Sequence, residues 1–110
     1  MVALAGFDDL RTLAAAGISA SYATVGVPAT YRIRSFCITN NTQGDLIFSL
    51  DNTVAAGQMF VAAGSYKLYD VQSNMNAQFD DSFVLPVGTQ FFVKQNTAPV
   101  DGDIWIEILR

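Results

Sequence analysis

The side chains best suited to chemistry in this sequence are carboxylates, and they form two small clusters. One is Asp80-Asp81 and the other is Asp101-Gly102-Asp103. Carboxylate oxygens beside a glycine turn suit a hard cation such as calcium, but such a site takes six or more oxygen ligands. The sequence places no further oxygen ligands near either cluster. We therefore expect solvated turns and no metal site.

The usual participants of catalysis are missing. The sequence has no histidine, which removes the commonest general base and the commonest transition-metal ligand. The single glutamate, Glu107, alternates with isoleucines, which separates it from a second carboxylate of the kind a glycosidase needs. The only cysteine, Cys37, is expected to be a buried, inert thiol that forms no disulfide. We predict that the protein is not an enzyme and uses no cofactor.

Two arginines and three aromatic residues are the candidate interface residues. Arg32 and Arg34 lie two positions apart in the same strand, so they share a face. They are expected either to bind an acidic partner or to pair with a carboxylate across the sheet. Asp45 and Glu107 are the available carboxylates, and the structural pairing is favoured.

Tyr69, Phe92 and Trp105 fall on strand faces that also carry charges. Aromatic side chains in such positions line either a carbohydrate platform or a subunit interface. For Trp105 the pattern leaves two roles open, a core filler or an interface anchor.

Composition favours an assembled protein and excludes several partners. Half of the residues are hydrophobic and only 15% are charged, which is a hydrophobic balance for a small monomer. Burial of apolar surface against other subunits would explain this high hydrophobic fraction. The alternative is that alanine and glycine in apolar loops raise the fraction without needing burial. The net charge is −4 and no basic run exists, so we expect no nucleic-acid partner. No secretory signal or membrane-length apolar run is found, which predicts synthesis in a cytoplasm and no membrane partner.

The clearest local signal is the segment 31–51, which predicts a β-hairpin. Two arms rich in β-branched and aromatic residues flank the polar turn 40–44. The first arm is apolar on both faces, so it is expected to be central in a sheet or to lie under a neighbour. In the second arm, Leu46, Phe48 and Leu50 form one buried row.

Residues 1–30 differ from the remainder, because about half of them are Ala, Gly, Ser or Thr. Residues 8–16 predict a short helix ended by Gly17, or an extended segment, since Leu10, Thr12 and Ala14 alternate. Residues 19–25 predict a strand. This arm cannot fold alone and must lie on the main domain or on a neighbouring subunit. One domain is expected, with residues 1–30 as arm and first strand and 31–110 as the core.

Further short strands are predicted at 59–61, 65–71, 82–86, 89–95 and 103–109, with turns between them. The total is seven or eight. Strands at this spacing, with no long helical period, are typical of an all-β fold. We predict a single antiparallel β-sandwich or jelly-roll-like barrel with an extended N-terminal arm.

A few runs of the sequence are distinctive. They are RIRSFCITNNTQGDLIFSLD, FVAAGSYKLYDV, FVLPVGTQFFVKQ and APVDGDIWIEIL, together with DLRTL at residues 9–13. With these runs, which span about three-quarters of its length, the chain resembles small virion structural proteins of tailed bacteriophages. Their matching features are the NNT strand end at 40–42, the strand 48–51, the hairpin 61–70, the strand 86–95 and the alternating C-terminal strand 102–109. These motifs are turns and strands, so they transfer no functional residue.

The resemblance implies a non-enzymatic virion component. It acts through assembly with itself as a homo-oligomer and with other virion proteins such as major capsid, portal, neck or tail proteins. Capsid decoration and a head–tail neck component are the favoured placements, with the N-terminal arm reaching a neighbouring subunit. The alternative is a carbohydrate- or receptor-binding module of a tail fibre, built from loop residues 74–81 and Trp105.

Overall fold

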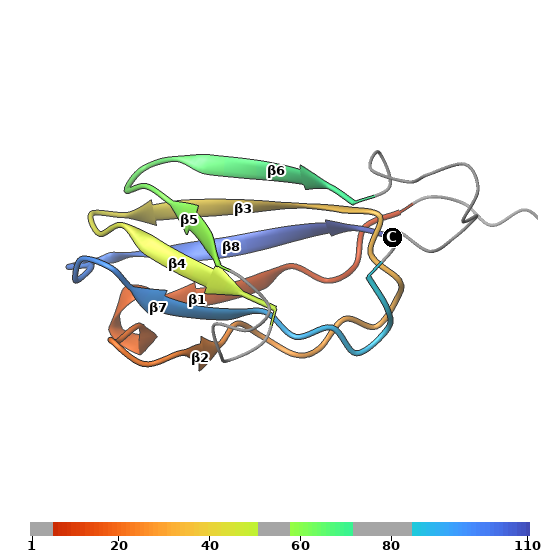
Figure 1. Ribbon diagram of the computed structural model, residues 1–110, viewed down its shortest axis with the longest axis horizontal. Coiled ribbons are helices and arrows are strands. Elements are labelled where there is room, and N and C mark those ends of the chain that lie inside the picture. Colours follow the sequence, from red (N-terminus) through yellow and green to blue (C-terminus); the bar gives the residue numbers. More distant parts are fainter. Residues whose placement is uncertain (1–5, 51–57, 72–84) are drawn as a thin grey trace, which may run out of the picture.

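Two four-stranded antiparallel sheets face each other in the computed structural model, which describes residues 6–50, 58–71 and 85–110 (Figure 1). Eight strands lie in these parts of the chain. Their bounds are β1 Arg11–Ala14, β2 Ala23–Thr24, β3 Ser35–Thr42, β4 Leu46–Ser49, β5 Met59–Val61, β6 Tyr66–Asp70, β7 Phe92–Gln95 and β8 Gly102–Leu109. The all-β prediction is confirmed.

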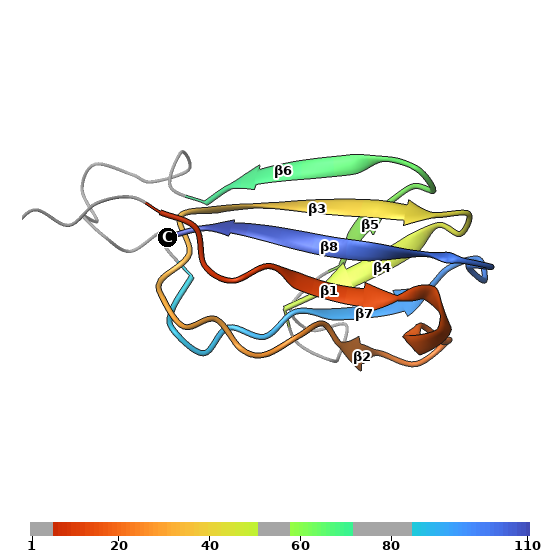
Figure 2. The same cartoon turned by 180° about the vertical axis from the view of Figure 1, so that it is seen from behind.

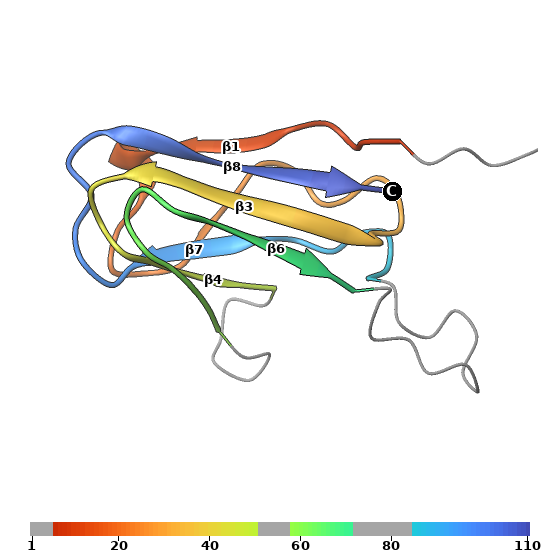
Figure 3. The same cartoon turned by 90° about the horizontal axis from the view of Figure 1, so that it is seen from above.

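The strand order is that of a jelly roll. Sheet A has the order β1-β8-β3-β6, and sheet B has the order β2-β7-β4-β5. Successive strands alternate between the two sheets, except that β4 and β5 are neighbours in sheet B. Eight strands wound in this way are two interlocked Greek keys. Sheet A is in front in Figure 2, and Figure 3 shows the two layers edge-on.

The predicted hairpin at 31–51 is wrong. Strand β3 pairs with β6 and β8 in sheet A, whereas β4 pairs with β5 and β7 in sheet B. The turn at 40–44 is therefore an arch that carries the chain from one sheet to the other. The prediction that β3 is a central strand is confirmed, because it has a partner on each side.

The buried side chain of Asn40 explains why the chain forms an arch. Its Nδ2 donates to the carbonyl oxygens of Gly44 at 2.8 Å and of Val61 at 3.1 Å. Its Oδ1 accepts from both the backbone N–H and the hydroxyl of Thr42. A side chain at Gly44 would overlap the carbonyl of Thr97. The polar residues of this turn thus satisfy buried backbone groups instead of forming an exposed hairpin loop.

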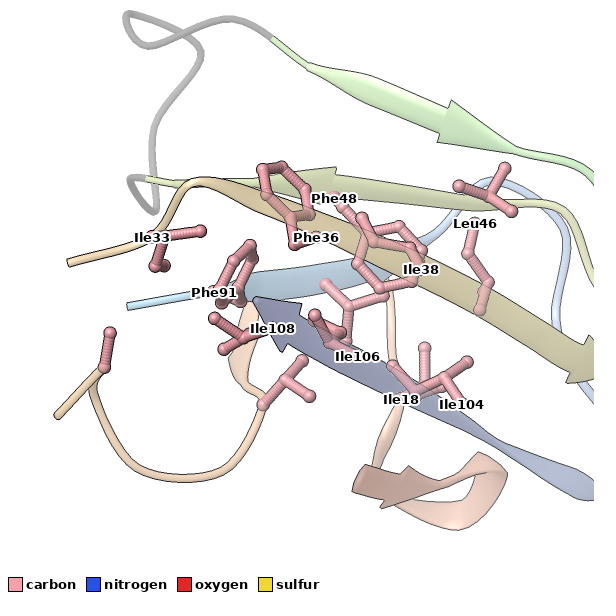
Figure 4. Packing of buried hydrophobic residues seen from close by; sticks show 14 residues of the cluster. Ile18, Ile33, Phe36, Ile38, Leu46, Phe48, Phe91, Ile104, Ile106 and Ile108 are labelled. Atoms are coloured by element: carbon pink, nitrogen blue, oxygen red, sulfur yellow. The ribbon is translucent and has the colours of Figure 1, made fainter. Parts of the chain in front are cut away.

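The core fills the space between the sheets, as Figure 4 shows. Sheet A contributes Ile38 of β3 and the isoleucine row of β8, and sheet B contributes Leu46 and Phe48 of β4. Leu50 packs against this cluster. The predicted row of β4 is buried at Leu46 and Phe48 and partly buried at Leu50. The alternation of isoleucines in β8 does not indicate whether they face the core or a partner, and the structure places them in the core. The fully buried members of the β8 row are Ile104, Ile106 and Ile108.

Residues 6–30 belong to the sandwich. The extended alternative holds, because β1 pairs with β8 and is followed only by a 3₁₀ turn at Ala15–Gly17. Strand β2 is shorter than the predicted 19–25, and it forms the edge of sheet B. Ile18 and Val25 enter the core. The described part of the arm thus lies on its own domain. The start of the expected strand 82–86 and Asp80-Asp81 lie outside the described residues.

A buried ion pair fastens this arm to the domain. Arg11 Nη1 lies 3.1 Å from Asp8 Oδ1, and both side chains are almost fully buried. The guanidinium also donates to the carbonyls of Asp9, Val27 and Pro28. A buried charge is tolerated only when it is paired and hydrogen-bonded, and this arginine is both.

Candidate functional site

The outer face of sheet A is the most exposed apolar surface that the described strands form. We call it the sheet A face. The buried isoleucines of β8 point into the core, so the alternating residues Trp105, Glu107 and Leu109 point outward. The strand register places Thr12, Trp105, Thr39 and Tyr66 in one row across the sheet. The next row holds Glu107, Cys37 and Leu68.

Four large apolar side chains around this face are mostly in solvent. The exposed fractions are 70% for Phe7, 58% for Leu10, 69% for Tyr66 and 67% for Leu68. Phe7 joins the face through its bridge to Leu109 at the end of β8. Exposed apolar groups that cluster on one sheet face, beside the half-buried Trp105, are typical of a protein interaction surface.

The outward charged side chains on the described strands of sheet A are acidic. Asp103 and Glu107 of β8 and Asp70 of β6 occupy outward positions, because each alternates with inward residues. No lysine or arginine occupies an outward position on the described strands of this sheet. The face is therefore apolar and acidic.

The outer face of sheet B, called the sheet B face, carries aromatic residues and lysine. Lys94 of β7 points outward, and its Nζ lies 4.8 Å from the centroid of the Tyr22 ring. In the register of the sheet, Lys94 is opposite Ile47, which is opposite Phe60. Lys67 of β6 reaches the rim of this face, where its Nζ lies 5.9 Å from the Phe60 ring. Lysine over an aromatic ring is a cation–π contact, which holds the charge at the surface.

The three predicted aromatic residues lie on three different surfaces. Trp105 is half-buried on the sheet A face, and Phe92 is half-buried on the sheet B face. Tyr69 instead points inward, where it packs against the core and stacks on Phe36 with ring centroids 5.1 Å apart. Burial raises the pKa of its hydroxyl. The prediction that Tyr69 lies on an outer strand face is wrong, because the register of β6 turns Tyr66 and Leu68 outward.

The two predicted arginines lie just before β3. Arg32 and Arg34 are exposed and flank the buried Ile33, which bridges to Leu85. The carboxylate of Asp45, one of their expected partners, accepts a hydrogen bond from the backbone N–H of Ala63. The backbone of Arg34 joins two strand ends of sheet A, because its N–H donates to Leu109 and its carbonyl oxygen accepts from Val71, next to Asp70.

Asp101 closes a turn. Its Oδ1 accepts from Gln43 Nε2 at 2.6 Å, and its backbone N–H donates to Gln43 Oε1. Gly102 follows with a positive φ of 90° as β8 begins. Within 6–50, 58–71 and 85–110, no group of three potential metal ligands comes together.

Cys37 lies on the sheet A face and not in the core. It is half-buried and points outward beside Glu107 and Leu68, whereas the sequence predicted a buried residue. Burial, and then the nearby Glu107 carboxylate, raise the pKa of the thiol. A raised pKa keeps the sulfur protonated and weakly nucleophilic.

Sequence reasoning missed Phe7, Leu10, Tyr66 and Leu68 as surface residues. The signal for Leu10 was its alternation with Thr12 and Ala14, which reads as a strand. For β6 the alternation gave two faces, Tyr66 with Leu68 and Lys67 with Tyr69, but did not indicate which face meets the core. Both faces contain large apolar side chains, so the pattern by itself was symmetric.

No protein-family model, no curated protein and no solved structure matches this chain. None of the described helical segments has the length and hydropathy needed to cross a bilayer. The role of the protein is therefore inferred from its own surfaces.

Proposed function

We propose that this protein is a non-enzymatic structural component of a tailed-phage virion that acts through protein–protein assembly. The favoured placements are capsid decoration and the head–tail neck. It is made in the cytoplasm of the host bacterium and resides in the particle. Its partners are other copies of itself and other virion proteins such as capsid, portal, neck or tail proteins.

The observation that carries the proposal is the sheet A face. Phe7, Leu10, Tyr66 and Leu68 are each more than half exposed and surround one side of a single sheet. Removing apolar surface from water is favourable by about 25 cal/mol per Å². A face of this kind therefore gains free energy when a protein surface covers it.

Two further features support the proposal. The motifs noted in the sequence, from the NNT turn at 40–42 to the C-terminal strand, resemble those of small phage virion proteins, and this resemblance motivates the proposal. The jelly roll is also an architecture that many capsid proteins use, although a fold by itself does not specify function.

The carbohydrate-binding alternative receives no support from the described surfaces. A glycan platform needs aromatic side chains side by side, and Tyr69, Phe92 and Trp105 lie apart. Residues 74–81, which would complete that site, are outside the described segments. A glycan array probed with the purified protein is expected to remain silent.

The test is incorporation into particles. The protein should be detected by mass spectrometry in purified virions, and a map of the particle should show it against other virion proteins. Leu68→Glu places a charge on the sheet A face and is expected to reduce incorporation at least tenfold. Val100→Glu is the matched control, because Val100 is also an exposed aliphatic residue but lies in the loop before β8.

Absence of the wild-type protein from virions would contradict the proposal. Equal incorporation of the Leu68 and Val100 variants would show instead that the sheet A face is not the assembly surface.

A further inference from the structure

We infer that the sheet A face of one copy of this chain docks on the sheet B face of the next copy. This inference rests on the proposed function and specifies how copies associate within the assembly. It follows from the opposite charges on the two faces of one sandwich.

The sheet A face offers carboxylates among apolar groups. Glu107 lies in the centre of its row, between Cys37 and the β1 side of the sheet, and is exposed. Asp103 lies further along the same strand. Trp105, between Asp103 and Glu107, supplies a flat apolar surface.

The sheet B face offers the complementary groups. Lys94 is outward in β7, between Tyr22 and Ile47, and Lys67 reaches its rim beside Phe60. Asp45, just before β4, is a carboxylate among the described residues on this side, and it accepts a hydrogen bond from the backbone N–H of Ala63. Apolar groups of β4, β5 and β7 surround the ammonium groups, as they surround the carboxylates on the other face.

A two-fold dimer through the sheet A face is disfavoured by the same charges. An isologous interface brings a patch against its own copy, so Glu107 and its neighbours would meet carboxylates. Like charges that face each other across an interface weaken association. Contact between unlike faces instead places Glu107 near lysine.

The two faces are unequal in extent. The strands of sheet A have 4, 8, 8 and 5 residues, and those of sheet B have 2, 4, 4 and 3 residues. The shorter strands of sheet B therefore limit the area of contact between the two faces. Because the contact is heterologous, each bound pair leaves one free face of each kind, and association continues into a ring or stack.

Charge reversal tests the inference. Sedimentation velocity across a concentration series should show wild-type protein growing beyond dimers. Glu107→Lys and Lys94→Glu should each raise the dissociation constant at least about tenfold. An equimolar mixture of the two variants should restore association, because each reversed face then meets its complement. The matched controls are Asp9→Lys and Arg34→Glu, which make the same charge changes at exposed positions off the two faces.

Three results would overturn the inference: a wild-type protein that stays monomeric, variants that associate like their controls, or a mixture that fails to recover. Tighter association of Glu107→Lys would identify a two-fold sheet A dimer instead. None of these results contradicts the proposed function if the protein is found in virions. The docking of one copy on the next and the role in the virion are therefore tested independently.

Discussion

Arg11 and Asp8 form an ion pair with a 3.1 Å separation, buried where the N-terminal strand meets the loop before β3. Asp8 Oδ2 accepts from the backbone N–H of Thr30 at 3.0 Å. Arg11 donates to the carbonyls of Val27 and Pro28. Two segments that are poor in large apolar groups are thus joined by polar contacts.

Removing one partner of this pair should strongly destabilise the fold. Arg11→Ala leaves the Asp8 carboxylate buried without its counter-ion, which costs roughly 3–5 kcal/mol of unfolding free energy. Arg34→Ala is the matched control, since Arg34 is exposed, and should cost less than about 0.5 kcal/mol. Urea denaturation followed by Trp105 fluorescence measures both. Equal losses for the two variants would show that the ion pair does not hold the arm.

Stability should fall at acid pH through Asp8. Burial by itself raises the pKa of this carboxyl, but hydrogen bonds from Thr30 and Asp9 and the Arg11 guanidinium outweigh it and hold the pKa below its ordinary value of 3.8. The folded state therefore favours the ionised form. Its contribution is complete above the ordinary pKa and is lost as the pH falls through the lower, folded-state pKa.

The measurement is the unfolding free energy of wild type and Asp8→Asn between about pH 6 and pH 2. The variant should be less stable at pH 6, and the difference between the two proteins should shrink as the pH falls. Asp9→Asn removes a neighbouring, exposed carboxylate and serves as the control. A difference that stays constant over this range would exclude Asp8 as the source.

Asn40 should be required for the arch, whereas its neighbour Asn41 should not. Asn40→Ala removes the donor to the buried Val61 carbonyl and the acceptor of the Thr42 N–H, whereas the Gly44 carbonyl keeps the Thr42 hydroxyl as a donor. Each unsatisfied buried group costs about 1–3 kcal/mol. Asn41 is exposed and one position away, so Asn41→Ala should change the unfolding free energy by less than about 0.5 kcal/mol. Thermal or urea unfolding of the pair gives the comparison.

Truncation of Ile106 should mainly lower the stability of the fold, whereas truncation of Trp105 should mainly weaken association between copies. Ile106→Ala creates a cavity in the core and should cost roughly 2–5 kcal/mol. Trp105→Ala removes a half-buried side chain from the sheet A face, so it should cost less stability but weaken association. Calorimetry and sedimentation on the two variants separate the roles. If Trp105→Ala proved the more destabilising of the two, the assignment of Trp105 to the outer face would be contradicted.

Alternating patterns along the chain determined the all-β class and the shared face of the β8 isoleucines, and they placed β3 either in the centre of a sheet or under a neighbour. Side chains alternate between the two faces of a strand, and this alternation can be read from the local sequence. When only one face is strongly apolar, that face is the one that packs against the core. The same logic failed for β6, where both faces carry large apolar groups, and so Tyr69 was assigned to the wrong face.

Only the tertiary structure decided how the strands were paired and which charges met. The segment around Asn40 to Gly44 has the composition of a hairpin turn, yet it spans two sheets, because Asn40 finds its partners on β5 and in the turn itself. The Arg11 and Asp8 pair depends on carbonyls sixteen or more residues away. The separation of carboxylates and lysines onto opposite faces likewise arises from strands distant in sequence. Sequence alone specified the strands, and long-range hydrogen bonds and packing specified their arrangement.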